Sequence, residues 1–160
     1  MSEIIRRASF SRCGRYRYAL WREWDPAFPQ VLFIGLNPAT ADAEKDDNTM
    51  RRCMYYARDW GYGSMAVGNL FAFRTTWPAE LKKAKDPVGK NNDRWLRKLT
   101  RESDMTVVMW GNDGGFLGRS SKVLTGIPDP YCFKVTSRGE PHHTRGLSNG
   151  IKPSPFRKIQ

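Results

Sequence analysis

The chain has 160 residues, a length typical of one domain with one hydrophobic core. Apolar residues make up 39% and aromatic residues 12%, which excludes disorder throughout. No apolar stretch approaches the roughly 18 residues of a membrane-spanning helix. Residues 1–7 are not followed by the apolar segment of a secretory signal, so we expect a cytoplasmic protein without a membrane partner.

The formal net charge is +11, and residues 1–24 and 137–160 together supply +8 of it. Both segments also contain aromatic residues. Basic residues mixed with aromatic ones are typical of surfaces that bind phosphates and stack bases. We therefore expect a nucleic acid or a nucleotide as partner; the alternative is a merely solvated basic surface.

The three cysteines, Cys13, Cys53 and Cys132, lie far apart in the sequence. They predict buried free thiols rather than a disulfide framework or an iron–sulfur site. No set of His, Cys and carboxylate residues has the spacing of metal ligands. We expect neither a metal nor another cofactor.

In chain order, strand patterns alternate with helix patterns. The expected elements are an antiparallel strand pair or extended arm over residues 15–24, a strand over 31–34, a helix that starts near 46–48 and is closed by Gly61 and Gly63, a strand over 64–71, a helix over 91–103, a strand over 105–110, a short helix over 120–124 and a strand over 131–135. The continuous apolar run 31–34 indicates a strand covered on both faces. This alternation predicts a three-layer α/β/α sandwich around a mainly parallel, four-stranded sheet.

No repeat or linker divides the sequence, so we expect a single domain over residues 1–160. Within it, residues 1–24 form a basic N-terminal antiparallel arm or hairpin and residues 25–147 form the α/β core. Residues 148–160 form a basic C-terminal tail. In sheets of this kind, ligands bind beyond the carboxyl ends of the strands, which places the site in the loops 35–40, 69–76, 111–115 and 137–146.

Asparagine and histidine side chains in these loops are candidates for chemistry. Asn37 can align a water or hold a carbonyl, although a turn role is equally common for such a residue. Asn69 offers the donor and acceptor needed to read a pyrimidine or amide edge, or it satisfies the loop backbone. The only histidines, His142 and His143, are adjacent, so one is expected to face the site and donate to a developing oxyanion; the alternative is an exposed pair without a function.

Asp46, Asp47, Arg51 and Arg52 form the densest charge cluster. One of the aspartates is expected to cap the following helix, and the other to act as a base or to hold an arginine. The two arginines either bind phosphate or form a solvated helix face. The glycine-rich segment 111–115 lacks the Lys-Ser/Thr of a P-loop, and no Gly-x-Ser-x-Gly elbow is present, so acyl transfer is excluded.

Several segments resemble the bacterial and phage family known as domain of unknown function 1643. They are Phe33–Asp42, Asp46–Cys53, Trp60–Gly63, Asn69–Ala72 and Asp86–Gly89. The resemblance covers about residues 14–147 in order. This family implies no established activity.

More distantly, four segments in order resemble motifs of the uracil-DNA glycosylase superfamily: Gly35–Pro38, Asn69, Trp110–Asn112 and His143. The resemblance implies that fold and a DNA repair or modification role as an N-glycosidic hydrolase acting on a uracil-like or modified base. Asn37 would position water, His143 would stabilise negative charge on the departing base, and Asn69 would read its edge. The Pro expected after the His is missing, and the absence of a four-cysteine cluster excludes the iron–sulfur branches.

The expected site residues have three roles. Asn37 and His143 are catalytic, and Arg145 and Lys152 bind the nucleic-acid backbone. The substrate-binding residues are Gly35, Pro38, Asp46, Asp47, Arg51, Arg52, Asn69, Phe71, Arg74, Trp110, Gly111 and Asn112. The alternatives are an enzyme of free nucleotides or nucleosides that uses the same pocket, and a non-catalytic nucleic-acid- or protein-binding module.

Overall fold

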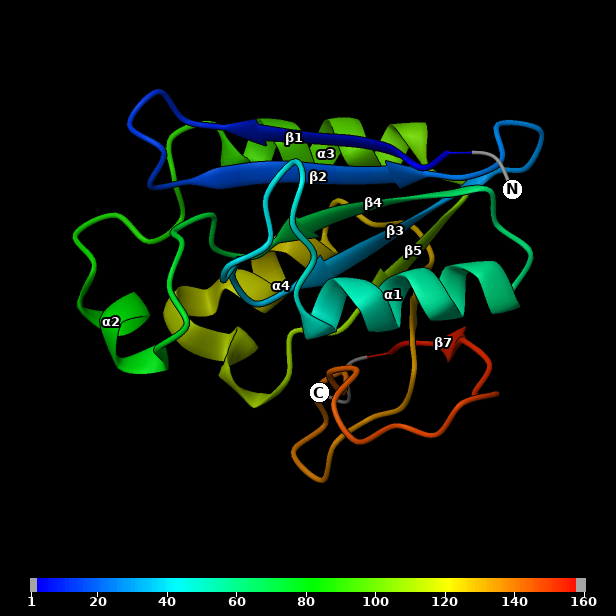
Figure 1. Ribbon diagram of the computed structural model, residues 1–160. Helices are drawn as coiled ribbons and strands as arrows, with labels where there is room; N and C mark the ends of the chain where they lie inside the picture. Colours follow the sequence, from blue (N-terminus) through cyan, green and yellow to red (C-terminus); the bar gives the residue numbers. More distant parts are fainter. Residues whose placement is uncertain (1–2, 158–160) are drawn as a thin grey trace.

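The computed structural model of the chain describes residues 3–157 (Figure 1). Residues 1–2 and 158–160, at the outer ends of the predicted arm and tail, lie outside the described residues. The strands are β1 (Ile5–Phe10), β2 (Arg17–Glu23), β3 (Gln30–Gly35), β4 (Ser64–Asn69), β5 (Met105–Val108), β6 (Pro130–Cys132) and β7 (Ser154–Pro155). The helices are α1 (Asn48–Asp59), α2 (Pro78–Lys83), α3 (Asn92–Glu102) and α4 (Arg119–Leu124), with a 3₁₀ segment, η1 (Asn112–Gly118).

The described strands form one sheet in the order β1-β2-β4-β3-β5-β6-β7. Its centre, β4-β3-β5-β6, is parallel, which confirms the α/β class. Antiparallel strands extend it on both sides, β2 and β1 beyond β4, and β7 beyond β6. The four predicted strands make up this parallel centre, and β1 and β2 form the predicted N-terminal antiparallel hairpin. The sheet is nevertheless larger than the four strands expected, because β1, β2 and β7 also join it through backbone hydrogen bonds, which require no particular side chains.

Helices cover both faces of the sheet (Figure 1). Successive side chains of a strand point to opposite faces. On β3, Val31 and Phe33 pack in the cluster that contains the apolar side of α1, while Leu32 and Ile34 pack in the cluster that contains α3. The prediction that this strand is buried on both faces is confirmed.

Helix α1 begins where the sequence predicts. The N-cap is Asp47, whose Oδ1 accepts the backbone N–H of Met50 at 2.9 Å. Met50, Cys53, Met54 and Ala57 are buried at helical spacing. The chain leaves the helix through Trp60 and Gly61, the latter at φ +88°, a left-handed conformation that favours glycine.

Close packing fixes α3 against the sheet beside the end of β4. A Cβ at Gly68 would lie 2.8 Å from Cδ2 of Leu96 and 3.3 Å from Cδ1 of Leu99. Only glycine permits this approach. The fully buried Asn92, at the start of α3, donates through Nδ2 to the backbone oxygens of Asn69 and Leu70. The helix therefore holds the first turn of the loop that follows β4.

The described part of the predicted tail is packed against the fold. Trp60 Nε1 donates to the backbone oxygen of Ile151 at 3.0 Å, and Phe156 is buried. Cys53 and Cys132 are buried free thiols, as expected, but Cys13 is exposed because it lies in the turn between β1 and β2. Within residues 3–157, no helix is long and apolar enough to cross a membrane.

Candidate functional site

A cleft of about 520 Å³ opens at the carboxyl ends of the parallel strands. Strand β3 has β4 on one side and β5 on the other, so successive connections leave this point in opposite directions, which is where open α/β sheets bind ligands. All four predicted loops contribute to the cleft. The lining includes Arg17, Gly35, Asn37, Pro38, Asp47, Thr49, Asn69, Thr75, Trp110, Gly111, Asn112, Asp113, His143 and Arg145.

The amide of Asn37 has a fixed orientation. Its Nδ2 lies 2.7 Å from the backbone oxygen of Thr75 and 3.2 Å from that of Pro38. Both partners are acceptors, so the NH₂ group must face them. The amide oxygen, Oδ1, is then the atom that Asn37 can offer to a water or a ligand donor.

Asn69 is oriented by a buried arginine. Nη2 of Arg17 donates to Oδ1 of Asn69 at 3.4 Å, and a guanidinium has no acceptor, so the oxygen must face it. Nδ2 of Asn69 lies 3.1 Å from the position of a Cβ at Gly35. Its acceptor is therefore already engaged, and Asn69 presents a donor to the cleft.

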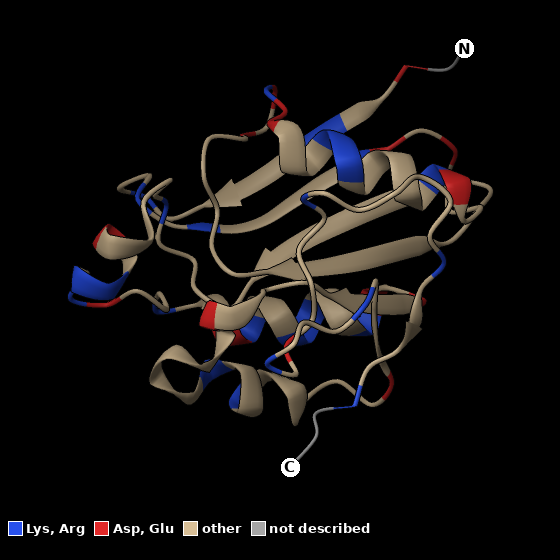
Figure 2. Ribbon diagram, turned by 90° about the horizontal axis from the view of Figure 1, so that it is seen from below, with Lys and Arg blue, Asp and Glu red and all other residues tan. Residues whose placement is uncertain are grey.

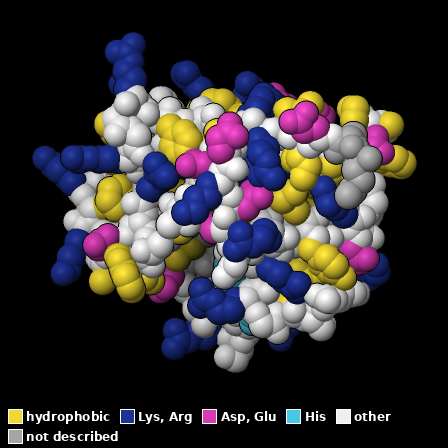
Figure 3. All heavy atoms as spheres, viewed as in Figure 1, with side chains coloured by type: hydrophobic (Ala, Val, Ile, Leu, Met, Phe, Trp, Pro, Cys, Tyr) yellow, Lys and Arg dark blue, Asp and Glu magenta, His cyan; other side chains and the backbone are white. Residues whose placement is uncertain are grey.

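The ring of His143 also has a defined tautomer. The backbone N–H of Arg145 donates to Nδ1 of His143 at 3.1 Å, so in the neutral ring the proton resides on Nε2. Nε2 lies 3.4 Å from Oγ1 of Thr49, at the start of α1. His142 does not line the cleft. His143 thus faces the cleft as a hydrogen-bond donor. On the face shown in Figure 3, Lys and Arg side chains lie close to the few histidine atoms that are visible.

Burial lowers the pKa of His143 below its ordinary value of 6.5, and the charges of Arg145 and His142 lower it further, whereas Asp47 opposes them. The unfolded chain therefore takes up this proton more readily than the folded protein. We expect a midpoint below 6.5 for His143 in an NMR titration of the ring Cε1–H signal. The contribution of the neutral His143 ring to the free energy of unfolding should be fully present above pH 6.5. It should be lost as the pH falls through the lowered pKa.

The decrease in the free energy of unfolding below pH 6.5 should be smaller in His143→Gln, because glutamine cannot titrate. Urea unfolding of both proteins at pH 7.5 and pH 5.5 provides the comparison. An equal loss of stability in both proteins over this interval would contradict the assignment.

Asp47 and Asp46 have separate roles although they are adjacent. Asp47 lines the cleft, caps α1 through Oδ1 and accepts the backbone N–H of Ala41 through Oδ2 at 3.3 Å. Asp46 lies outside the cleft and pairs with Arg22 and Arg6, each at 2.9 Å. Asp47 is thus the aspartate placed to meet a ligand, and Asp46 is the one that holds arginines.

The loop after β5 is held by the segment that carries His143. Trp110 Nε1 donates to Oε2 of Glu140 at 2.9 Å, and the N–H of Gly111 donates to the backbone oxygen of Pro141 at 2.8 Å. Oδ1 of Asn112 accepts from Thr136 Oγ1 at 2.7 Å. The glycine-rich segment 111–115 was expected as a loop, but all of it except Gly111 lies in η1.

Five other expected site residues lie away from the cleft lining: Arg51, Arg52, Phe71, Arg74 and Lys152. Arg51 is exposed at the start of α1, Phe71 is buried in the core, and Lys152 pairs with Asp59 at 3.5 Å. Arg52 donates to Asn149, Tyr56 and the backbone oxygen of Leu147. Arg74 lines an adjoining hollow with Arg15.

Sequence reasoning missed Arg17, which is 2% exposed and lines the cleft. Its place in an alternating strand pattern suggested an outward-facing residue of a basic arm. However, β2 lies between β1 and β4, inside the sheet. The signal that Arg17 is buried is its place in a strand directly before Tyr18, Ala19 and Leu20, which are all buried.

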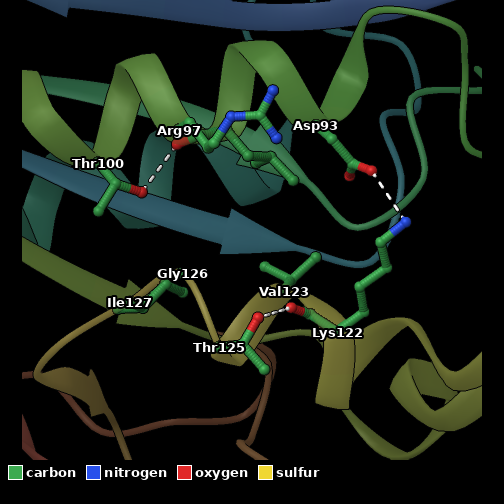
Figure 4. A pocket seen from close by; sticks show the side chains of 9 residues that line it. Asp93, Arg97, Thr100, Lys122, Val123, Thr125, Gly126 and Ile127 are labelled. Carbon is green, nitrogen blue, oxygen red and sulfur yellow. Dashed lines mark hydrogen bonds and ion pairs between the residues drawn. The ribbon is translucent and has the colours of Figure 1, made fainter.

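A smaller hollow of about 170 Å³ lies between α3 and α4 (Figure 4). Lys122 and Asp93 face each other at its edge and pair at 3.3 Å. None of the expected site residues lines it. Within residues 3–157, no group of three or more His, Cys, Asp and Glu side chains is arranged to hold a metal ion.

A family model described as "protein of unknown function" (DUF1643) matches residues 17–144 of the chain. The chain belongs to the DUF1643 family. This range begins at Arg17 and ends one residue after His143, so it contains Asn37, Asn69 and both of these residues. No curated protein and no solved structure matches the chain.

Proposed function

We propose that this DUF1643 protein is an N-glycosidic hydrolase of the DNA glycosylase kind, with a uracil-DNA glycosylase-like fold, that releases a uracil-like or modified base. One observation carries the proposal: Asn37, Asn69 and His143 line a single cleft, and each has a defined hydrogen-bonding orientation. The combination of an acceptor for water and two donors for a heterocycle suits hydrolysis of the bond between a base and its sugar.

The reaction would proceed through an oxocarbenium-like transition state, with positive charge on the sugar and negative charge on the departing base. Oδ1 of Asn37 would orient the attacking water but cannot take its proton at neutral pH. Asp47 is the carboxylate of the expected pair that lines the cleft, and it would receive that proton. Asp46 cannot serve, because it lies outside the cleft lining, where it pairs with Arg6 and Arg22.

His143 would stabilise the departing base by donating from Nε2 to an oxygen on which negative charge develops. A neutral imidazole suits this role, and the burial that lowers its pKa keeps it neutral. Asn69 would donate from Nδ2 to a carbonyl oxygen of the base. Because its own oxygen is engaged by Arg17, we propose that Asn69 reads an acceptor rather than a donor–acceptor pair.

A base within DNA must leave the stack to enter such a cleft. The flanking phosphates would meet basic residues near the opening: Arg145 lines the cleft, and Arg15 and Arg74 line the adjoining hollow. Figure 2 shows Lys and Arg on several elements rather than at the chain ends alone. Lys152, which pairs with Asp59 outside the cleft, is a weaker choice for this contact.

The test is release of bases from oligonucleotides that carry uracil or modified bases, single- and double-stranded, with abasic sites revealed by alkaline cleavage. Asn37→Ala should abolish release, whereas Asn149→Ala, outside the cleft lining, should not. DNA binding that depends on salt and persists in Asn37→Ala, with no abasic sites from any substrate, would instead show a binding module.

A further inference from the structure

Three arginine side chains are almost completely buried: Arg17, Arg22 and Arg119. Arg22 pairs with Asp46 at 2.9 Å, and Arg119 pairs with Asp93 at 2.8 Å. Within the described residues 3–157, Arg17 has no carboxylate within 4.0 Å. A buried charge without a paired charge is costly, so such groups normally have a partner of opposite sign.

The protein contacts of Arg17 are with neutral groups. Nη1 donates to the backbone oxygen of Ala41 at 3.1 Å and Nη2 to Oδ1 of Asn69, while Nε has no hydrogen-bond partner. Burial lowers the pKa of Arg17 to about 10, which still leaves the side chain charged at neutral pH. A cation with unused donors therefore lines the cleft.

The surrounding charges do not neutralise this cation. Asp47 is the acidic group that favours the charge of Arg17, but its two oxygens accept backbone N–H groups, and Arg74 and Arg22 oppose that effect. Asp113, also in the cleft lining, pairs with Lys82 at 3.3 Å. The cleft lining carries two arginines, Arg17 and Arg145, and two aspartates, and neither aspartate forms an ion pair with Arg17.

We propose that the cleft binds its ligand through an oxyanion, a phosphate or a carboxylate, seated against Arg17 and the neighbouring Asn69. A planar guanidinium with free N–H groups suits both oxyanions. With a carboxylate, the inference deepens the proposed function, on which it then rests, because the released base would be acidic. With a phosphate, the substrate would be a free nucleotide, which is the alternative substrate class for the same pocket.

The first test uses inorganic phosphate with the full chain, measured by calorimetry and by the rise in Tm. Wild type should bind phosphate and gain thermal stability. Arg17→Met should bind at least about tenfold more weakly, as expected for loss of a charge-assisted hydrogen bond. Arg94→Met, which removes an exposed arginine of α3 outside the cleft lining, should bind like wild type.

Arg17→Met should also lose little stability without phosphate, because it removes an uncompensated charge. A structural arginine would behave differently: its loss would lower Tm while leaving the response to phosphate unchanged. Should Arg17→Met fail to fold, Arg17→Lys keeps the charge but not the planar fork and should bind phosphate more weakly than wild type.

The second test distinguishes the sources of the oxyanion and requires no turnover, so it is independent of base release. It compares 2′-deoxyuridine 5′-monophosphate with 2′-deoxyuridine, and 5-carboxyuracil with uracil. A preference of about tenfold or more for the anionic member of one pair, lost in Arg17→Met, identifies that source. Equal affinities in both pairs, or a preference that Arg17→Met retains, would overturn the proposal.

Discussion

Replacing His143 with alanine is expected to slow base release by about 100- to 1000-fold, the usual effect of removing one donor from a developing oxyanion. The donor is Nε2, since Nδ1 accepts from the backbone of Arg145. Because the negative charge arises in the transition state, the loss should appear in kcat rather than in KM. Single-turnover release of the base from an oligonucleotide measures this rate.

The adjacent histidine supplies the control. His142 does not line the cleft, so His142→Ala should remain within a few-fold of wild type. His143→Gln retains an N–H donor and should recover part of the rate lost in His143→Ala. Equal rates for His143→Ala and His142→Ala would show that His143 has no part in the reaction.

Replacing Asp46 with alanine should lower the free energy of unfolding by about 3–5 kcal/mol, the cost of leaving a buried ion without its partner. Arg22 is fully buried, and its Nε donates to Oδ1 of Asp46. Urea unfolding at neutral pH measures the change. Asp59→Ala, which removes an exposed pair with Lys152, should cost only about 0–1 kcal/mol.

The same pair predicts how acid affects stability. Burial raises the pKa of Asp46, but hydrogen bonds from Arg6 and Arg22 outweigh it and leave the pKa below the ordinary 3.8. The carboxylate therefore stabilises the fold at pH values above 3.8, and this contribution is lost as the pH falls through the lowered pKa. Asp46→Ala should show a shallower acid limb than wild type; parallel limbs would contradict the assignment.

The sequence predicts the parts of this fold that local chemistry determines. The apolar run 31–34 indicates a strand covered on both faces, and an aspartate before Met50 is typical of a helix N-cap; the structure has both features. The antiparallel hairpin of β1 and β2 was also predicted, but not that it extends the sheet. Strand β7 was not predicted, because it joins the sheet by backbone pairing over two residues whose side chains carry little signal.

In the candidate site, too, some features follow from the sequence and others depend on tertiary contacts. The rule that ligands bind at the carboxyl ends of parallel strands brought Asn37, Asn69 and His143 together before any coordinates. The orientation of each amide and the tautomer of the imidazole depend on tertiary contacts with Thr75, Arg17 and Arg145. No local pattern encodes those contacts. Arg17 was missed because its strand was expected in an outer arm and not inside the sheet.

Contacts of the segment 147–151 help to fix the position of the His143 imidazole, which precedes it in the chain. Tyr56, on α1, donates to the backbone oxygen of Ser148, and Trp60, just after α1, donates to that of Ile151. On the N-terminal side of the same segment, β6 is held in the sheet. The arc that carries His143 is thus tethered at both ends. These contacts fix the geometry of the arc before a ligand binds. A change at Trp60, which is remote from the reacting atoms, would therefore misalign the His143 imidazole for the proposed reaction.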